Sequence, residues 1–313
     1  MDLMFRKGIK YLIIILFCSA LWACSPLTAE QMQAAGELTF RADTIARSPQ
    51  ILLTELAGIR MERGLLHSAS VTSPDLHLAE LDAVAAGVEK DRTDINQSGV
   101  YVQVLQSYLR ALKSLSHEDR RNAMGVQLRG IGREIEGIIE DYNSLDTGYG
   151  NIPEGYAALA GQVSGYISRA VMKSVQGKVL KETVLTADTL VGATCDSLIS
   201  VLKSRRMNDL IENEQTALGY NYQSLLARME NGGFPPCVDL DRKYVELKLR
   251  ADRISDIRNS CVSALRSLKN AHHKLAVNYA AGKQNQQDAP LPEDIWKEID
   301  EVTGLARKIA ALL

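Results

Sequence analysis

Apolar residues recur at alternating steps of three and four positions through most of the chain after residue 28, which is the spacing of one face of an α-helix. In the stretch 74–115 the repeating positions are Leu81, Val84, Val88, Ile95, Val102, Leu105, Leu109 and Leu112. Asp91 and Ser98 occupy the two polar positions on the same face. The pattern predicts either one long helix or two segments hinged near Asn96–Gly99.

The most regular periodicity lies near the C-terminus, where Arg258 and His272 are the polar members of an otherwise mainly apolar face. The face comprises Leu240, Tyr244, Leu247, Ala251, Ile254, Arg258, Cys261, Leu265, Leu268, His272, Leu275 and Tyr279. Roughly 40 helical residues at about 1.5 Å each predict a rod near 60 Å long. Helical periodicity also runs from 178 to about 229, with possible kinks at Lys203–Asn208 and at Gly219.

Helix-start signals divide the N-terminal part of the pattern. Thr28 and Gln31 have the spacing of a capping box, in which each side chain bonds the other residue's backbone N–H. Ser48–Pro49 and Ser73–Pro74 each have the form of an N-cap followed by the first helical residue, a position that proline favours. We therefore expect a second helix to open at Pro49, a polar loop at 67–73 and another helix at Pro74, with no proline inside a helix.

Further breaks are predicted in the middle of the chain. Ser116 and Asp119 resemble a capping-box start for the next helix, and residues 143–153 (NSLDTGYGNIP) form a loop after it. The triplet Asn231–Gly233 ends a later helix, because glycine readily takes the left-handed cap conformation.

The helix expected after residue 153 has few charges and carries Ala157, Gly161 and Gly165 on one face. Small residues at this spacing allow close packing of helices in bilayers, so a membrane-inserting hairpin is one interpretation. The interpretation we prefer is a central helix against which its neighbours pack closely.

These elements together predict an all-α protein, an elongated up-and-down antiparallel bundle with long coiled-coil-like helices. The bundle is expected at residues 29–281, and a division into two sub-bundles at 143–153 stays open. A linker at 282–292 leads to a C-terminal amphipathic helix at 293–313.

The first 23 residues have the organisation of an export signal. Three basic residues precede an apolar core at 11–20, which is too short to span a bilayer comfortably. The next four residues, Leu21-Trp22-Ala23-Cys24, resemble the lipobox of bacterial lipoproteins, although Trp22 stands where a small residue is usual. The resemblance implies cleavage after Ala23, a diacylglycerol on the Cys24 thiol and frequent acylation of the new amine. An ordinary signal peptide or an uncleaved helix are the alternatives.

The resemblance also implies a location. Residues 24–28 become a lipidated tether, and two or three acyl chains hold a protein on a membrane essentially permanently. Ser25 follows the modified cysteine, and by the sorting rule of enterobacteria a residue other than Asp there implies the outer membrane. We expect the domain to face the periplasm or the cell exterior.

Composition and charge narrow the function classes. The formal net charge is −2, and removing a leader with three basic residues and one Asp leaves the mature chain near −4. This mild negative charge disfavours nucleic acid as a partner, since nucleic-acid binding needs a basic face. Aromatic residues make up only 5%, which suits helices packed on aliphatic side chains.

Candidate chemistry is sparse. The chain has no P-loop, GxSxG, HExxH, EF-hand loop or Glu-x-x-His motif, so we expect no catalytic set, cofactor or metal site. Arg258 and His272 are candidates for an ion or ligand site inside the bundle, with a role in helix register as the preferred alternative. Residues Lys203–Arg206 are interpreted as a solvated face or kink, with an anionic-lipid contact as the alternative.

Three cysteines, Cys195, Cys237 and Cys261, follow Cys24, and export would allow at most one intramolecular disulfide among them. A continuous helix puts Cys195 and Cys237 roughly 60 Å apart, and a hairpin turn near residue 235 leaves Cys261 roughly 20 Å from Cys195. A disulfide needs Cα atoms within about 7 Å. We therefore expect no bridge or a break at Lys203–Asn208, and we prefer buried free thiols for Cys195 and Cys261.

The function that these observations favour is non-enzymatic: a membrane-anchored lipoprotein whose helical domain binds or scaffolds another envelope protein. A module that binds a small molecule or metal ion, and an enzyme with a non-contiguous site, are the two alternatives. The mature domain otherwise resembles helical exported lipoproteins of unknown function only in general character.

Overall fold

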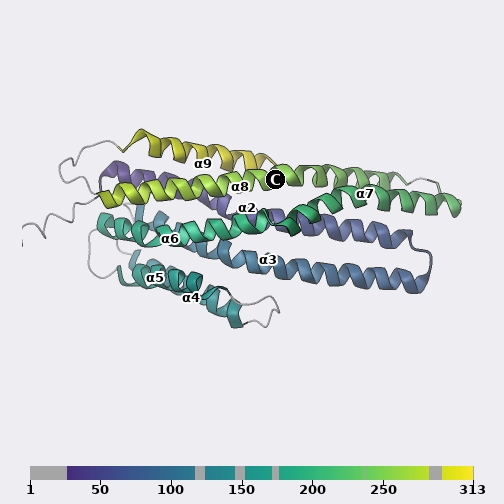
Figure 1. The fold of residues 1–313 in the computed structure, drawn as a ribbon, viewed down its shortest axis with the longest axis horizontal. Helices are drawn as coiled ribbons and strands as arrows, with labels where there is room; N and C mark the ends of the chain where they lie inside the picture. Colours follow the sequence, from purple (N-terminus) through teal and green to yellow (C-terminus); the bar gives the residue numbers. More distant parts are fainter. Residues whose placement is uncertain are drawn as a thin grey trace, which may run out of the picture.

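The computed structural model describes residues 27–116, 124–144, 152–170, 176–235, 237–281 and 291–312. This part of the chain consists of α-helices and short connections, without a β-strand, so the predicted all-α class is confirmed (Figure 1). The helices are α2 (Ala29–Ser70), α3 (Pro74–Ser116), α4 (Met124–Ser144), α5 (Glu154–Ala170), α6 (Gln176–Leu202), α7 (Arg205–Asn231), α8 (Val238–Ala281) and α9 (Glu293–Leu312). The predicted leader, Cys24, Asp119 and most of the predicted linker lie outside the described residues.

α2 is the central element of an elongated molecule. It contacts α3, α7, α8 and α9 along its length. In Figure 1, α2, α3 and α8 run through most of the molecule, and α6 and α7 follow one another beside them. α9 packs on α8 and α2 at one end, while the α4–α5 hairpin packs on α3 and α6. With 42 residues rising about 1.5 Å each, α2 is about 60 Å long.

The predicted start of α2 is confirmed. The Thr28 side chain accepts a hydrogen bond from the Gln31 backbone N–H at 3.1 Å, and the Gln31 side chain accepts one from the Thr28 N–H at 3.0 Å. This capping box satisfies two backbone donors that the first helical turn leaves unpaired. The polar loop predicted at 67–73 is shorter than expected, because α2 extends to Ser70.

The prediction of a new helix at Pro49 is wrong, since α2 continues through this residue. Proline lacks the N–H that would bond the carbonyl four positions earlier, which here belongs to Ile45. The Ser48 hydroxyl takes its place and donates to the Ile45 carbonyl oxygen at 2.8 Å. Both Ser48 and Pro49 are buried. A side-chain hydrogen bond thus replaces the missing backbone one and keeps the buried carbonyl paired.

α3 begins at Pro74 as predicted and shows no hinge at Asn96–Gly99. Its two halves are packed differently: residues 74–97 include no buried residue, whereas buried positions recur from Ser98 onward. In Figure 1 the first half of α3 runs beside α2, away from α4, α5 and α6. This half therefore lacks the second layer of helices that covers the rest of α3.

The stretch 178–229 is divided at Lys203–Ser204, inside the segment where a kink is predicted. The Ser204 side chain accepts a hydrogen bond from the Met207 N–H at 3.1 Å and caps the start of α7. Gly219 lies within α7 and does not interrupt it. α7 ends as predicted, with Gly233 in the left-handed region at a φ of 72°.

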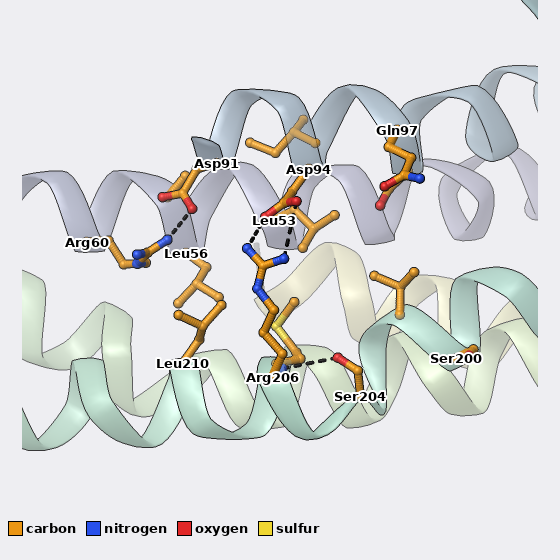
Figure 2. Close-up of a pocket in the computed structure, with 15 residues that line it drawn as sticks. Leu53, Leu56, Arg60, Asp91, Asp94, Gln97, Ser200, Ser204, Arg206 and Leu210 are labelled. Atoms are coloured by element: carbon orange, nitrogen blue, oxygen red, sulfur yellow. Dashed lines mark hydrogen bonds and ion pairs between the residues drawn. The ribbon is translucent and has the colours of Figure 1, made fainter. Parts of the chain in front are cut away.

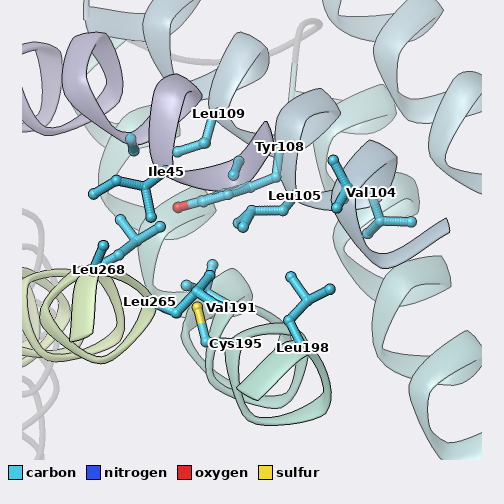
Figure 3. Packing of buried hydrophobic residues seen from close by; sticks show 14 of the residues in the cluster. Ile45, Val104, Leu105, Tyr108, Leu109, Val191, Cys195, Leu198, Leu265 and Leu268 are labelled. Atoms are coloured by element: carbon cyan, nitrogen blue, oxygen red, sulfur yellow. The ribbon is translucent and has the colours of Figure 1, made fainter. Parts of the chain in front are cut away.

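In the part of the chain that the structure describes, the hydrophobic core consists of one large and one small cluster. The small cluster joins Leu66 of α2, Leu218 and Leu225 of α7 and Leu247 of α8. The large cluster fills the rest of the bundle, and Figure 3 shows its centre, where α2, α3, α6 and α8 meet. The end of the molecule formed by the α2–α3 and α7–α8 turns therefore has a thin core of its own.

The prediction that α5 is a central helix is wrong. α5 contacts α4 and α6 and lies at the edge of the bundle (Figure 1). A Cβ added to Gly161 would meet no atom within 4 Å, so no neighbouring helix packs closely against this glycine. The buried face consists instead of Tyr156, Ala160, Val163, Ser164 and Ile167.

One stretch of the described residues, Gly177–Leu202 within α6, is long and apolar enough to cross a membrane. α6 contacts α3, α5 and α8. It buries Leu180, Val184, Leu190, Val191 and Leu198 against them. Packing against these helices accounts for the apolar residues on its buried face.

The Ser48–Ile45 hydrogen bond yields a test by double-mutant cycle. Ser48→Ala is expected to lower the free energy of unfolding by about 1–3 kcal/mol, because it leaves a buried carbonyl unpaired. In a Pro49→Ala background the backbone N–H is restored, so the same change is expected to cost less than about 1 kcal/mol. Urea unfolding of the four proteins measures both values. Ser260→Ala serves as the matched control, because it removes a buried hydroxyl that has no hydrogen-bond partner among the described residues. Equal costs of Ser48→Ala in the wild-type and Pro49→Ala backgrounds would contradict the prediction.

Candidate functional site

A cavity of about 330 Å³ lies at the α6–α7 break, between α2, α3, α6 and α7 (Figure 2). Its apolar wall includes Leu53, Leu56, Ile95, Met207 and Leu210. Its polar rim consists of two ion pairs, Arg60–Asp91 and Arg206–Asp94, which join α3 to α2 and to α7. The cavity is large enough for a small molecule, with an apolar wall and a charged rim.

The rim continues into a buried ion-pair network. Glu214 of α7 is only 3% exposed and lies between Arg60 and Arg63 of α2. Arg63 Nη2 donates to Glu214 Oε1 at 3.3 Å, and Arg60 Nε lies 3.4 Å from the same oxygen. A buried carboxylate is tolerated when charged hydrogen bonds replace its lost hydration. The network therefore links α2 and α7 at the boundary between the two core clusters.

The charges of the cavity rim and of the adjoining Glu214 network neutralise one another. Three arginines, Arg60, Arg63 and Arg206, face three carboxylates, Asp91, Asp94 and Glu214. Burial raises the pKa of Asp91 above its ordinary value of 3.8, an effect that the Arg60 charge only partly offsets and that the Asp94 charge reinforces. Every ionised group here already has a partner, so the arrangement favours holding helices together over binding a charged ligand.

His272 is buried among hydrogen-bonding groups from three helices. Its Nε2 lies 2.6 Å from the Tyr108 hydroxyl, and its Nδ1 lies 3.0 Å from Asp188 Oδ1. The Nδ1 of His273 lies 2.8 Å from the other Asp188 oxygen. Both ring nitrogens of His272 therefore have a hydrogen-bond partner, one on α3 and one on α6.

The chain Asp188–His272–Tyr108 has the order of a general-base relay, but its hydroxyl is inaccessible. Tyr108 is 0% exposed and His272 is 1% exposed. Burial raises the pKa of Tyr108 well above 10.0, the ordinary value. A proton relay needs a substrate within hydrogen-bond reach of the end group, and none has room there. The cluster therefore joins α3, α6 and α8, which favours the register interpretation of His272.

Asp188 is the one member of the Asp188–His272–Tyr108 chain that reaches solvent. Burial acts to raise the pKa of its carboxyl, but hydrogen bonds from His272 and His273 and the charges of the two rings outweigh this, and the pKa is lowered below 3.8. The fold thus stabilises the ionised form of the Asp188 carboxyl.

The structure does not bring Arg258 and His272 together. They are 14 positions apart on α8, or about 21 Å. Arg258 is partly exposed, and its guanidinium donates to the side-chain oxygens of Asn208 and Asn259. A single ligand site formed by both residues, as considered from the sequence, is therefore excluded by their separation.

Cys195, Cys237 and Cys261 are free thiols. Cys195 and Cys261 are buried, as preferred from the sequence, and Figure 3 shows Cys195 close to Leu265 in the core. Burial raises the pKa of the Cys195 thiol to about 12 and that of Cys261 to about 11. Both are therefore protonated and unreactive at neutral pH.

Within the described residues, no group of three or more His, Cys, Asp or Glu side chains could hold a metal ion. In comparisons with known proteins, no family model matched the chain, and neither the curated proteins nor the solved structures returned a match. The site must therefore be interpreted from its own geometry.

A second candidate site is the end of the molecule formed by the α2–α3 and α7–α8 turns. Ten of the thirteen exposed large hydrophobic side chains lie there, although residues 61–88 and 220–249 make up fewer than half of the described residues. We call these ten residues the distal surface: Met61, Leu65, Leu76, Leu78, Val88, Tyr220, Phe234, Val238, Val245 and Leu249. Apolar side chains gathered in this way are typical of protein interaction sites.

Sequence reasoning found some of these residues and missed others. Asp91 and His272 stand out in the sequence because each interrupts an apolar helical face. Glu214, Asp188 and Tyr108 carry no such signal, because their partners lie on other helices and are far away in the chain.

The lowered pKa of Asp188 sets a pH dependence. A carboxyl whose pKa is lower in the folded than in the unfolded protein stabilises the fold above the unfolded pKa, and this contribution is lost as the pH falls through the folded pKa. We expect Asp188→Asn to be less stable than the wild type at about pH 7 and the difference to shrink as the pH falls below about 4. Urea unfolding across this range measures it.

Asp196→Asn is the control, because this exposed carboxylate on the same helix pairs with Lys269 at the surface. Its removal is expected to change the free energy of unfolding by about 1 kcal/mol or less. A pH-independent difference for Asp188→Asn would contradict the role given to its ionised form.

Proposed function

We propose that the protein is a bacterial lipoprotein, held on the outer membrane by the lipid on Cys24, whose helical domain binds another envelope protein without catalysing a reaction. The distal surface carries this proposal. The proposal includes an up-and-down bundle with coiled-coil-like packing of its long helices. Stiff helices would hold the binding end at a constant distance from the anchor.

The position of the anchor supports the proposal. Cys24 precedes the start of α2 by only a few residues, and the start of α2 and the α2–α3 turn lie at opposite ends of the molecule (Figure 1). The distal surface is therefore about 60 Å from the lipidated end. A bundle that projects from the membrane would present this surface to other components of the envelope.

The packing at this end supports a protein partner. In the first half of α3, Leu76 and Leu78 are 62% and 60% exposed, and no residue between 74 and 97 is buried. Across the end of the molecule, Phe234 and Val238 are 68% and 69% exposed at the α7–α8 turn. Covering these side chains would complete a core that is thin in the free protein.

Charge favours a protein over a lipid surface at this end. Residues 65–85 contain Asp75, Glu80 and Asp82 and no lysine or arginine. Anionic membranes attract basic segments, so an acidic, apolar end would be repelled by them. A protein with an apolar contact surface and a polar or basic rim is the matching partner.

The anchor has a direct test. Cells expressing the wild-type chain with a radiolabelled palmitate precursor are expected to incorporate label into the protein, and Cys24→Ser is expected to abolish incorporation, because the lipid is attached through this thiol. Cys237→Ser is the matched control and should keep the label. Equal labelling of the Cys24→Ser variant would overturn the lipoprotein assignment.

Site-specific photocrosslinking tests the distal surface. A photoreactive residue at Leu76, Leu78 or Val238 is expected to give the same protein adduct in intact envelopes, whereas Phe40 and Val277, exposed apolar residues outside the distal surface, are expected to give none. Leu76→Asp with Leu78→Asp should reduce the adduct at Val238 about tenfold or more, while changing stability by less than about 0.5 kcal/mol each, because both side chains are exposed.

The pattern of adducts decides the outcome. Crosslinks of equal strength at Phe40 and Val277, or an adduct at Val238 that survives the double substitution on α3, would overturn the proposal that these two turns form one binding end.

A further inference from the structure

A shallow cleft of about 360 Å³ lies where α8 passes the break between α6 and α7. One wall is a single face of α8, because its residues recur at four-residue steps, and the other wall comes from the break and the first turn of α7. The lining residues, which we call the basic cleft, are Lys203, Asn208, Arg258, Asn259, Val262, Ser263 and Arg266.

The basic cleft is lined by three cations and no acid. Among the residues that the structure describes, none of Lys203, Arg258 and Arg266 forms an ion pair. Arg258 is held by the side-chain oxygens of Asn208 and Asn259, and its Nη2–Asn259 Oδ1 distance is 3.4 Å. The two amide NH₂ groups and the Ser263 hydroxyl remain as further hydrogen-bond donors.

Other cations of α8 that face a neighbouring helix form ion pairs with acidic residues. Lys243 pairs with Glu62 of α2, Arg250 with Glu55 of α2, and Lys269 with Asp196 of α6. The α8 positions between Arg250 and Lys269 that line the cleft include two cations, Arg258 and Arg266, and no acid. The excess positive charge is thus confined to this section of the helix.

The adjacent cavity at the same break provides an internal comparison. Its arginines are neutralised by carboxylates of α3 and α7, so it has no charge left for a ligand. The first turn of α7, which contributes Asn208 to the basic cleft, adds the positive end of a helix dipole. Because the cations of the cleft repel one another, an anion bound between them would lower their electrostatic energy.

We propose that the basic cleft binds a phosphate-type anion carried by a larger molecule. Two guanidinium groups supply paired N–H donors that match tetrahedral oxyanions, and the lysine supplies a point charge. Three positive charges suit the charge of a phosphomonoester, between about −1.5 and −2 at neutral pH. The open side of the cleft leaves room for the rest of the ligand. This site is separate from the distal surface and does not depend on its function.

The phosphate could belong to a soluble ester or to a lipid headgroup. Arg258 precedes Tyr279 by 21 positions on α8, and the Tyr279 hydroxyl donates to the Gln31 carbonyl at 2.6 Å near the start of α2. The cleft is therefore about 30 Å along the rod from the anchored end. A lipid headgroup would reach it only if the bundle lay along the membrane, whereas a soluble ester would reach it in either orientation.

Calorimetric titration of the full chain in a neutral detergent tests the site, with inorganic phosphate as the probe at constant ionic strength. One saturable site is expected at millimolar or lower concentration. Arg258→Gln with Arg266→Gln should weaken it about tenfold or more, because charged hydrogen bonds are lost. Lys203→Gln, a change at an exposed side chain, should weaken it in the same direction. Arg242→Gln with Arg253→Gln removes two exposed charges elsewhere on α8 and should leave the affinity unchanged.

Two further probes distinguish the sources. Glycerol 3-phosphate binding more tightly than dihexanoyl phosphatidic acid, which is also a phosphomonoester, would assign a soluble ester, and the reverse order would assign a lipid headgroup. Dihexanoyl phosphatidylcholine, which is zwitterionic, should bind weakly in either case. Absence of saturable phosphate binding, or binding that the cleft variants and the control variant weaken equally, would overturn the proposal. Circular dichroism at helix wavelengths confirms that each variant is folded.

Discussion

Burial of one face of α2 along its whole length holds the other helices in place. α3, α7, α8 and α9 all pack against this helix, and its buried side chains extend from Ala34 to Ser68. A helix with proline near its middle keeps this role only if the freed carbonyl is satisfied, and the hydroxyl of Ser48 does so at Ile45. Without that hydrogen bond the two halves of α2 would be joined by a backbone with an unpaired buried acceptor.

A network of ion pairs separates the two apolar clusters that pack against α2. Glu214, set between Arg60 and Arg63, stands at the boundary of the two apolar clusters. Beyond it, α3 is covered on one side only and the core is small. Regions with few buried apolar contacts open at lower free energy than the core. The same arrangement leaves apolar side chains exposed at the end of the rod, where a partner would cover them.

The break at Lys203–Ser204 separates a cavity whose charges balance from a cleft with excess positive charge. The cavity between α2, α3 and α7 is electrically balanced, because its arginines and carboxylates pair across helices. The cleft on the α8 side has Arg258 and Arg266 without such partners. Both follow from ending α6 and starting α7 with a cap at Ser204, which exposes side chains that a continuous helix would present elsewhere.

Helical periodicity, capping signals and glycine placement determined the all-α class, the capping box at Thr28, the start at Pro74 and the weak point at Lys203, because these depend on neighbours within a few positions. Local signals misjudged Pro49, where tertiary packing makes a continuous buried helix favourable. Only the tertiary structure decided that Tyr108 and Asp188 meet His272 while Arg258 does not. Partners on separate helices are chosen by how whole faces pack, and no short-range pattern in the chain specifies that choice.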